Sequence, residues 1–344
     1  NQKGGYIGAP GGGKMYKGVR SSYDRYHGGT SFSYDLRLGL KTSFTGKDLL
    51  FTRLRSGNMG ANPFGGAGVR QTALDTAFNS NNAVKIDRLY YRFPLGRNFT
   101  VMTGPLMRNT EAMGYKPTAY GRGGQTQLDF FGGDLGVPGV WNKWTGAGFG
   151  AIYSNKASVE KGDAFWTVAA NYVAKNGNKG DTTDGGFMTD NAAGSITSQV
   201  AYGSKKWGLA AGYRYGQCGT NMRNGTQYLS ANSYFIPCTV VNKKGFEKRT
   251  EADSHSWSFN AFWRPTDSSW IPSISSGVGT TYTGGDFHGY YKRKGIARGI
   301  SSPAGWLVCS GATSSWRAMI LVLPLVRVSS PRQHPTTIPK TATT

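Results

Sequence analysis

Acidic residues are scarce in this sequence, and its last part has none. The 344 residues carry 18 Asp and Glu against 40 Lys and Arg, a formal net charge of +22. Every acidic residue lies at or before Asp286, and Lys and Arg continue to the end. The basic residues alternate with aromatic residues and do not gather in one cluster. The charge therefore gives little support to a nucleic-acid-binding surface, and we predict no nucleic-acid partner.

Long apolar runs are also missing. The best candidate, Met319 to Val328, is interrupted by Pro324 and Arg327, whereas a membrane-spanning helix needs ~20 apolar residues. No segment shows helical amphipathic periodicity of useful length. Hydrophobic residues make up 38% of the chain and aromatic residues 13%, with 51 glycines. This composition favours many short or twisted strands with Gly-rich connections over packed helices.

Residues suited to catalysis or metal binding are sparse. Residues 8–15 resemble a phosphate-binding loop, but Met15 stands where a hydroxyl should bind Mg²⁺. Residues 146–151 match a dinucleotide-binding pattern, yet they open an expected strand and not a helix. Neither metal-ligand nor triad spacing relates the four histidines, His27, His255, His288 and His334. We predict no enzyme activity, no catalytic residue, no cofactor and no metal site.

The chain has three cysteines. Cys218 and Cys238 bracket a polar segment, and a disulfide between them would contribute ~3 kcal/mol in an oxidising compartment. The alternative is two unrelated buried thiols. We predict the disulfide, whereas Cys309 falls in the acid-free tail.

Alternating strands are the dominant positive feature. Residues 82–105 predict a hairpin with its turn at 94–98, because Pro and Gly there stop both strands. Its first strand alternates apolar and charged residues, so one face is wet and the other apolar. Further strands are predicted at 31–41, 49–58, 148–154, 164–174, 195–203, 206–215, 254–264 and 271–281. Short turns alternate with long polar loops along this series.

Two architectures fit such a series. A transmembrane β-barrel has antiparallel strands of ~10 residues, lipid-facing and lumen-facing side chains in alternation, and aromatic girdles at both interfaces. A soluble β-sandwich also alternates, but it should not place so many Arg and Lys in mid-strand. We predict an all-β, antiparallel transmembrane barrel and keep the sandwich as the alternative.

Charged residues within these strands form the candidate functional site. In a barrel they would line an aqueous lumen and favour anions, whereas on a sandwich they would be solvated ion pairs of little individual weight. The predicted pore-lining residues are Arg53, Arg55, Lys85, Asp87, Arg88, Arg92, Arg108 and Lys116. Ile86 and Tyr90 share the strand parity of Arg88 and Arg92, so simple alternation leaves the side of these two arginines open. The long connection at 106–144 is expected to fold inward and narrow the pore.

Six blocks of the sequence carry a resemblance to a known family. They are SFTGKDLLFTRLRSGN (43–58), KIDRLYYRFPLG (85–96), GPLMRNTEAMGYKPTAY (104–120), LDFFGG (128–133), SFNAFWRP (258–265) and WIPSIS (270–275). In this order they resemble the cyanobacterial outer-membrane porins, which are similar to the carbohydrate-selective porins and include members called iron-uptake porins. The resemblance implies a 16-stranded barrel, a homotrimer in outer-membrane lipid, and passive passage of small solutes and inorganic ions without a cofactor. Members also carry a signal peptide and a periplasmic S-layer-homology domain, which would be the only contact with cell-wall polymer.

We accordingly expect this chain to be a fragment with three parts. Residues 1–30 are a Gly-rich polar segment from a truncated loop, residues 31–285 are the barrel domain, and residues 286–344 are an aberrant basic tail that lies out of frame. Plausible codons for residues 306–344, read two bases on, yield a peptide that regains acidic residues and strand-like alternation. The predicted function is passive diffusion of small hydrophilic solutes, ions and sugars through a partly cationic lumen. The alternative is a secreted or surface β-sandwich that binds polysaccharide or an acidic polymer.

Overall fold

The computed structural model describes residues 30–61, 77–119, 136–137, 139–220, 238–241, 247–249, 253–265, 273–284 and 301–310. Its strands are β1 (Asp35–Thr42), β2 (Leu49–Gly57), β3 (Lys85–Leu95), β4 (Phe99–Arg108), β5 (Thr145–Ser154), β6 (Phe165–Ala174), β7 (Gly194–Gly203), β8 (Trp207–Gln217), β9 (Thr239–Val241), β10 (Glu247–Arg249), β11 (Asp253–Trp263), β12 (Ser273–Gly284) and β13 (Ser301–Ser310). Short 3-10 helices are η1 (Met59–Ala61), η4 (Asn109–Ala112) and η6 (Asn155–Ser158). None of the helices in these ranges is long and apolar enough to cross a membrane.

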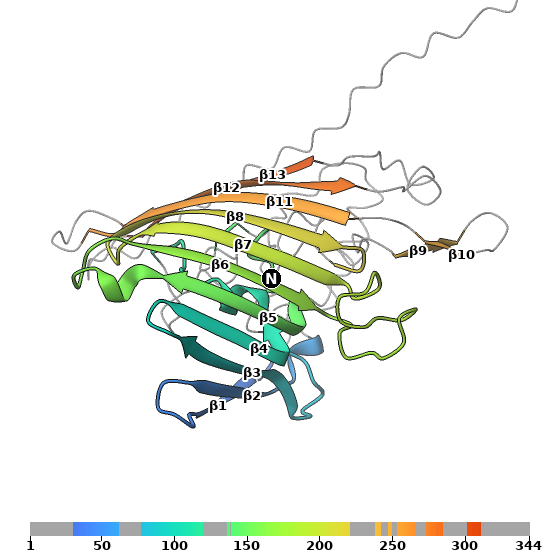
Figure 1. Ribbon diagram of the computed structural model, residues 1–344. Helices are drawn as coiled ribbons and strands as arrows, with labels where there is room; N and C mark the ends of the chain where they lie inside the picture. Colours follow the sequence, from blue (N-terminus) through green and yellow to red (C-terminus); the bar gives the residue numbers. More distant parts are fainter. Residues whose placement is uncertain are drawn as a thin grey trace, which may run out of the picture.

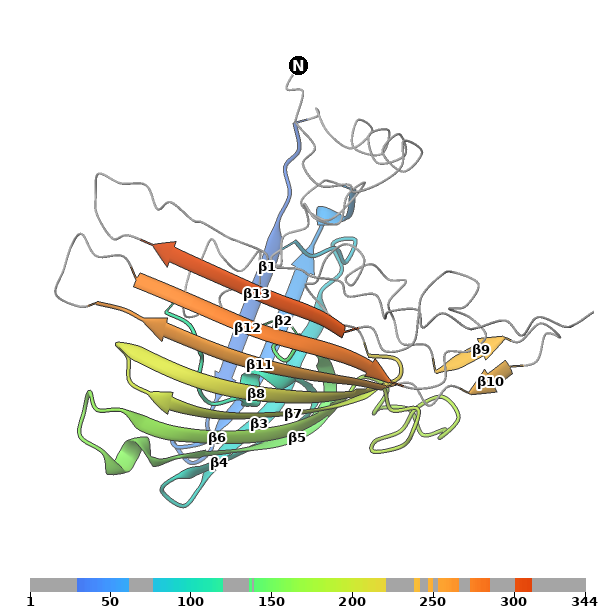
Figure 2. The same ribbon diagram turned by 90° about the horizontal axis from the view of Figure 1, so that it is seen from above.

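Eleven strands form one antiparallel sheet in the order β1 to β8, then β11, β12 and β13 (Figure 1). Neighbouring strands in this order are antiparallel. The small β9–β10 ribbon lies apart from the sheet, in the connection between β8 and β11 (Figure 2). Figure 1 shows β1 and β13 at opposite ends of the curved sheet. The described strands thus form an open sheet, and the prediction of an antiparallel all-β fold is confirmed.

The predicted strands coincide with β1 to β8, β11 and β12, with small differences at their ends. β13 is an addition: residues 301–310 of the segment expected to lie out of frame pair with β12. The reading frame of that segment stays a prediction. The Gly-rich N-terminal segment lies outside the described residues except for Thr30.

Short turns and long connections alternate at the ends of the strands, as the sequence predicts. The turns at 43–48, 96–98 and 204–206 join strands at one end, and the connections at 109–144, 175–193 and 218–252 join them at the other. Gly96 has φ +69°, a conformation that a tight reversal requires and that residues with a Cβ rarely adopt. All eleven strands of the sheet have 8 to 12 residues, which suits a tilted strand that crosses ~30 Å of hydrocarbon.

The β1–β2 turn is organised by one carboxylate. Asp48 accepts hydrogen bonds from the Tyr91 hydroxyl (2.6 Å), the Ser43 hydroxyl (2.7 Å), and the Thr45 backbone N–H (2.8 Å) and hydroxyl (2.7 Å). The bond from Tyr91 and those from Ser43 and Thr45 hold the pKa of the Asp48 carboxyl well below its usual range. The ionised form of Asp48 therefore fastens the turn to β3.

Substitution of Asp48 by Asn is expected to lower the denaturant midpoint in a pH-dependent way. The native state favours ionised Asp48, so its contribution is fully present above the unfolded-state pKa of about 3.9 and is lost as the pH falls toward the native pKa. We expect the midpoints of wild type and Asp48→Asn to differ at neutral pH and to converge below about pH 4. Unfolding curves in detergent over this range measure the difference, and a constant gap down to the lowest pH would contradict it.

The two faces of the sheet have inverted polarity. Large apolar side chains are exposed on the outer face: Leu36, Leu38, Leu40, Phe149, Trp166, Val168, Ile196, Val200, Leu209, Trp257, Phe259, Trp263 and Val278. The buried positions between them in β6, β7, β8, β11 and β12 are largely polar: Thr167, Asn171, Ser195, Thr197, Gln199, Arg214, Ser254, Ser256, Asn260, Ser275 and Thr281. A water-soluble sheet that packs on a core shows the opposite arrangement.

Candidate functional site

A β-bulge decides which charged side chains face inward on β3. Arg53 of β2 pairs with Arg88, but Leu54 pairs with Ile86, so Asp87 is the extra residue. A bulge sets two consecutive residues against one on the neighbouring strand. Asp87 and Arg88 consequently share the inner side of the sheet, whereas Ile86 is 52% exposed on the outside. Arg88 is therefore buried on the inner side of the sheet because of the bulge, which simple alternation of residues does not reveal.

Asp87 is the centre of an inner-face charge cluster. It accepts a bond from Arg53 Nε (2.8 Å) and a shorter one from Arg53 Nη2. Arg88 Nη1 lies 2.7 Å from the other carboxylate oxygen, and Arg55 Nη1 lies 3.7 Å from Oδ2. Three guanidinium groups thus surround one carboxylate whose side chain is only 15% exposed.

Two further carboxylates complete this cluster. Asp35 of β1 accepts two bonds from Arg55, at 2.9 and 2.6 Å, and pairs with Arg37 at 3.0 Å. Glu111 of η4 accepts a bond from Arg88 Nε at 3.1 Å. We name the whole set the Arg–Asp cluster: Asp35, Arg37, Arg53, Arg55, Asp87, Arg88 and Glu111. Glu111 links the wall of the sheet to the connection that follows β4.

That connection lies against the inner face of the sheet. We name residues 109–119, 136–137 and 139–144 the inward segment. Gln199 of β7 donates to the carbonyls of Met113 (3.2 Å) and Tyr115 (2.8 Å). The backbone N–H of Val137 donates to Asn260 of β11 (3.1 Å). For the described residues of this connection, these bonds agree with the expected inward fold. Its effect on a pore stays a prediction.

Glycines on β5 let the inward segment approach the sheet. A Cβ at Gly150 would lie 2.8 Å from the Asn171 Cβ and 3.0 Å from the Ala112 Cβ. A Cβ at Gly148 would lie 2.5 Å from the Tyr172 carbonyl oxygen. Real Cβ contacts are longer, so η4 can sit against β5 only while Gly150 lacks a side chain, whereas the close contact at Gly148 is with the backbone of β6.

Substitution of Gly150 by Val is expected to push η4 away from β5. Overpacking of this kind destabilises by roughly 1–3 kcal/mol. Unfolding in detergent and protease cleavage within the inward segment measure the two effects. The control is Gly180→Val, because no atom lies within 4 Å of a Cβ built there. If the two variants unfold at the same midpoint and are cleaved equally, the close approach at Gly150 does not contribute to the stability of the fold.

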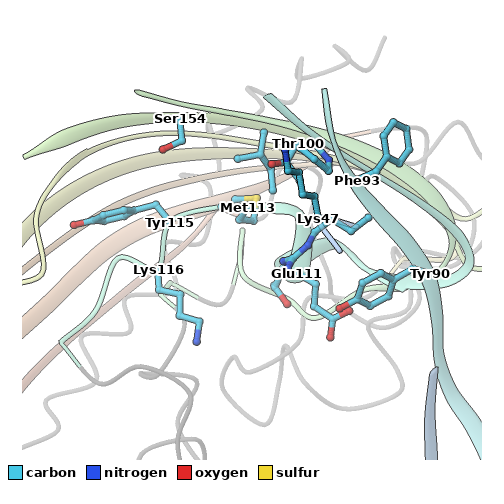
Figure 3. A pocket seen from close by; sticks show the side chains of 14 residues that line it. Lys47, Tyr90, Phe93, Thr100, Glu111, Met113, Tyr115, Lys116 and Ser154 are labelled. Carbon is cyan, nitrogen blue, oxygen red and sulfur yellow. The ribbon is translucent and has the colours of Figure 1, made fainter. Parts of the chain in front are cut away.

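A pocket of about 520 Å³ opens between the inward segment and β3–β5. Its polar lining residues include Lys47, Tyr90, Arg92, Glu111, Tyr115 and Lys116. Figure 3 shows Lys47, Glu111 and Lys116 around one hollow, with the ring of Phe93 directed away from them. The basic side chains outnumber the single carboxylate, so the pocket suits anions and hydroxylated solutes.

The predicted pore-lining residues fall into two groups and two isolated positions. Arg53, Arg55, Asp87 and Arg88 belong to the Arg–Asp cluster, and Arg92 and Lys116 line the pocket. Lys85 is exposed opposite Arg55 at the start of β3. Arg108 ends β4, with Nε 3.5 Å from the Thr145 hydroxyl. Their contact with a permeating solute stays a prediction.

Sequence reasoning missed Lys47, Glu111 and Arg214 as parts of the inner face. Lys47 lies in a turn and Glu111 in a loop, where alternation carries no information about direction. Arg214 follows the regular alternation of β8, so its inward position could have been found.

Two further predictions concern the cysteines and metal binding. Cys218 and Cys238 are joined by a disulfide with their Cα atoms 4.9 Å apart. In the ranges given above, no group of three or more His, Cys, Asp or Glu is arranged to hold a metal ion.

Comparisons with known proteins give distant and partial similarities. No protein-family model matches the chain. It is 31% identical over 201 residues to the uncharacterised protein sll0772 of Synechocystis sp., covering 55% of this chain and 33% of the relative. It is 28% identical over 252 residues to the uncharacterised protein alr4550 of Nostoc sp., covering 69% of this chain and 42% of the relative. The chain therefore spans less than half the length of these curated relatives.

Two solved structures show weak overall similarity. The chain matches OprB of Pseudomonas putida with a TM-score of 0.41 and 14% identity, covering 82% of this chain and 65% of that one. It matches a mutant of the porin of Rh. blastica with a TM-score of 0.27 and 10% identity, covering 81% of this chain and 85% of that one.

Proposed function

We propose that the chain forms the wall of an outer-membrane channel for passive diffusion of small hydrophilic solutes and inorganic ions. The inverted polarity of the sheet carries this proposal. Trp257 is 58% exposed on the outer face, while Gln199 is 2% and Arg214 0% exposed on the inner one. Hydrocarbon outside and water inside favour this arrangement, and only a closed barrel then pairs every strand. A soluble sandwich would bury its apolar face.

Aromatic side chains at both ends of the strands support a membrane-spanning wall. Beside the short turns, the ring of Tyr202 packs against Trp166 and Trp207, with centroid distances of 4.6 and 5.6 Å. Tyr213 and Trp257, 4.4 Å apart, lie nearer the long connections. Girdles of this kind mark the two interfaces of outer-membrane barrels.

The proposal also covers the charge of the lumen, the extent and assembly of the barrel, and the reading frame of the tail. The lumen is partly cationic, supported by Lys47, Arg92 and Lys116 around the pocket, and it passes anions more readily than cations. The barrel domain is residues 31–285 and assembles as a homotrimer of the cyanobacterial porin type, which also passes sugars. The matches to proteins of Synechocystis and Nostoc support that origin. Residues 286–344 are out of frame, which the gene's nucleotide sequence tests directly.

Conductance in a planar lipid bilayer tests the channel proposal. The chain refolded in detergent should produce discrete conductance steps and should migrate differently on a gel before and after heating. Reversal potentials across a salt gradient should show anion preference. A soluble monomer without conductance would overturn the proposal and favour a surface sandwich that binds polysaccharide.

A further inference from the structure

Arg214 is a buried cation that belongs neither to the Arg–Asp cluster nor to the pocket lining. It lies on the inner side of β8, is 0% exposed, and is covered by the inward segment. Its Nε donates to the Gly139 carbonyl at 2.6 Å, and its Nη2 lies 3.3 Å from the hydroxyls of Ser254 and Ser256. Within the described ranges Arg214 has no carboxylate partner, whereas the arginines of the Arg–Asp cluster do. A guanidinium stays protonated in proteins, so a full positive charge is buried here.

Donors outnumber acceptors around this guanidinium. Arg214 Nη1 is buried and has no hydrogen-bond partner among the described residues. The Ser256 hydroxyl accepts from Arg214 and from Thr281 (2.9 Å), and no acceptor within the described residues takes its own proton. The Ser254 and Thr220 hydroxyls donate to backbone carbonyls, and neither oxygen accepts a hydrogen bond from Nη1. Buried donors without acceptors are rare and costly.

We propose that Arg214 and the hydroxyls beside it bind one small monovalent anion of the chloride class. The anion supplies both missing features, a negative charge and an acceptor for the Nη1 protons. Water would supply an acceptor but would leave the charge uncompensated. The bound anion holds the turn at Gly139 against the wall formed by β8, β11 and β12.

Close packing on both sides restricts the size of the anion. A Cβ at Gly216 would lie 2.7 Å from the Thr220 hydroxyl and 2.8 Å from that of Ser254. A Cβ at Gly139 would lie 2.7 Å from the Thr281 hydroxyl. Packing this close beside the guanidinium favours a monatomic anion over the larger phosphate or sulfate.

Salt replacement at constant ionic strength tests the site. The refolded chain in detergent should unfold at a temperature ~3 °C or more higher in chloride than in gluconate, because a ligand that binds only the native state stabilises it. Arg214→Met should abolish this difference, with no fall of its midpoint in gluconate below that of wild type. The matched control Lys161→Gln removes one exposed positive charge and should keep the difference.

The outcomes separate the anion site from the channel. Equal midpoints of wild type in the two salts, or an Arg214→Met variant that keeps the chloride effect, would overturn the site. Crystals grown in bromide give an independent reading, also if Arg214→Met does not fold: an anomalous peak beside Nη1 supports the site, and water or a carboxylate there overturns it. None of these measurements depends on conductance, so either proposal can fail without the other.

Discussion

Substitution of Asp87 by Asn should lower the free energy of unfolding by about 3 kcal/mol or more, the cost of breaking a buried ion pair from one side. Arg53 and Arg88 are directly opposite each other in the register of β2 and β3, and both contact Asp87. Without the carboxylate, the two positive charges repel each other. The Arg53 side chain is only 16% exposed and that of Arg88 1%, so water screens this repulsion poorly. Unfolding in detergent followed by tryptophan fluorescence measures the loss.

Two further variants test whether the loss of stability is specific to Asp87: one at an exposed aspartate and one that restores the local charge balance. Asp163→Asn removes the same charge from an exposed position and should change stability little, since isolated surface charges contribute little. The double variant Asp87→Asn with Arg53→Gln restores the charge balance and should recover part of the loss. If Asp87→Asn and Asp163→Asn have the same midpoint, Asp87 does not hold the cluster together.

The strands of this fold were predictable because their physical signal is local. Trp166, Val168 and their buried neighbours on β6 alternate at a period of two, which reflects the pleat itself. The side of Arg88 was not predictable in the same way. One extra residue at Asp87 reverses the parity between Ile86 and Arg88, and no residue type marks the position of a bulge.

The partners of the charged residues depend on contacts across long stretches of sequence. Arg88 meets Glu111 only because η4 folds back onto β5, which in turn requires Gly150. A sequence pattern can indicate that a long connection is functional. It does not contain the packing that decides which side chain of the connection meets which strand.

Reversal of the pocket charges should reverse the ion preference of the channel. Lys47, Arg92 and Lys116 line the pocket between the inward segment and β3–β5. Their joint replacement by Glu converts three positive charges into three negative ones. In water a unit charge at ~8 Å changes the energy of a passing ion by about 0.5 kcal/mol, and screening at about 0.1 M salt roughly halves this. The six-unit change then amounts to about 1.4 kcal/mol for each ion, unfavourable for anions and favourable for cations. The anion-to-cation permeability ratio therefore changes by about 2.8 kcal/mol, or roughly a hundredfold.

The matched control for this reversal is the triple variant Lys161→Glu, Lys179→Glu and Lys205→Glu. It changes the net charge of the chain by the same amount, but its three residues are exposed in turns and loops and do not line the pocket. Reversal potentials should change sign for the pocket variant and keep their sign for the control. Equal shifts in both variants would mean that total surface charge sets selectivity, and no shift in either would place the ion path away from the pocket.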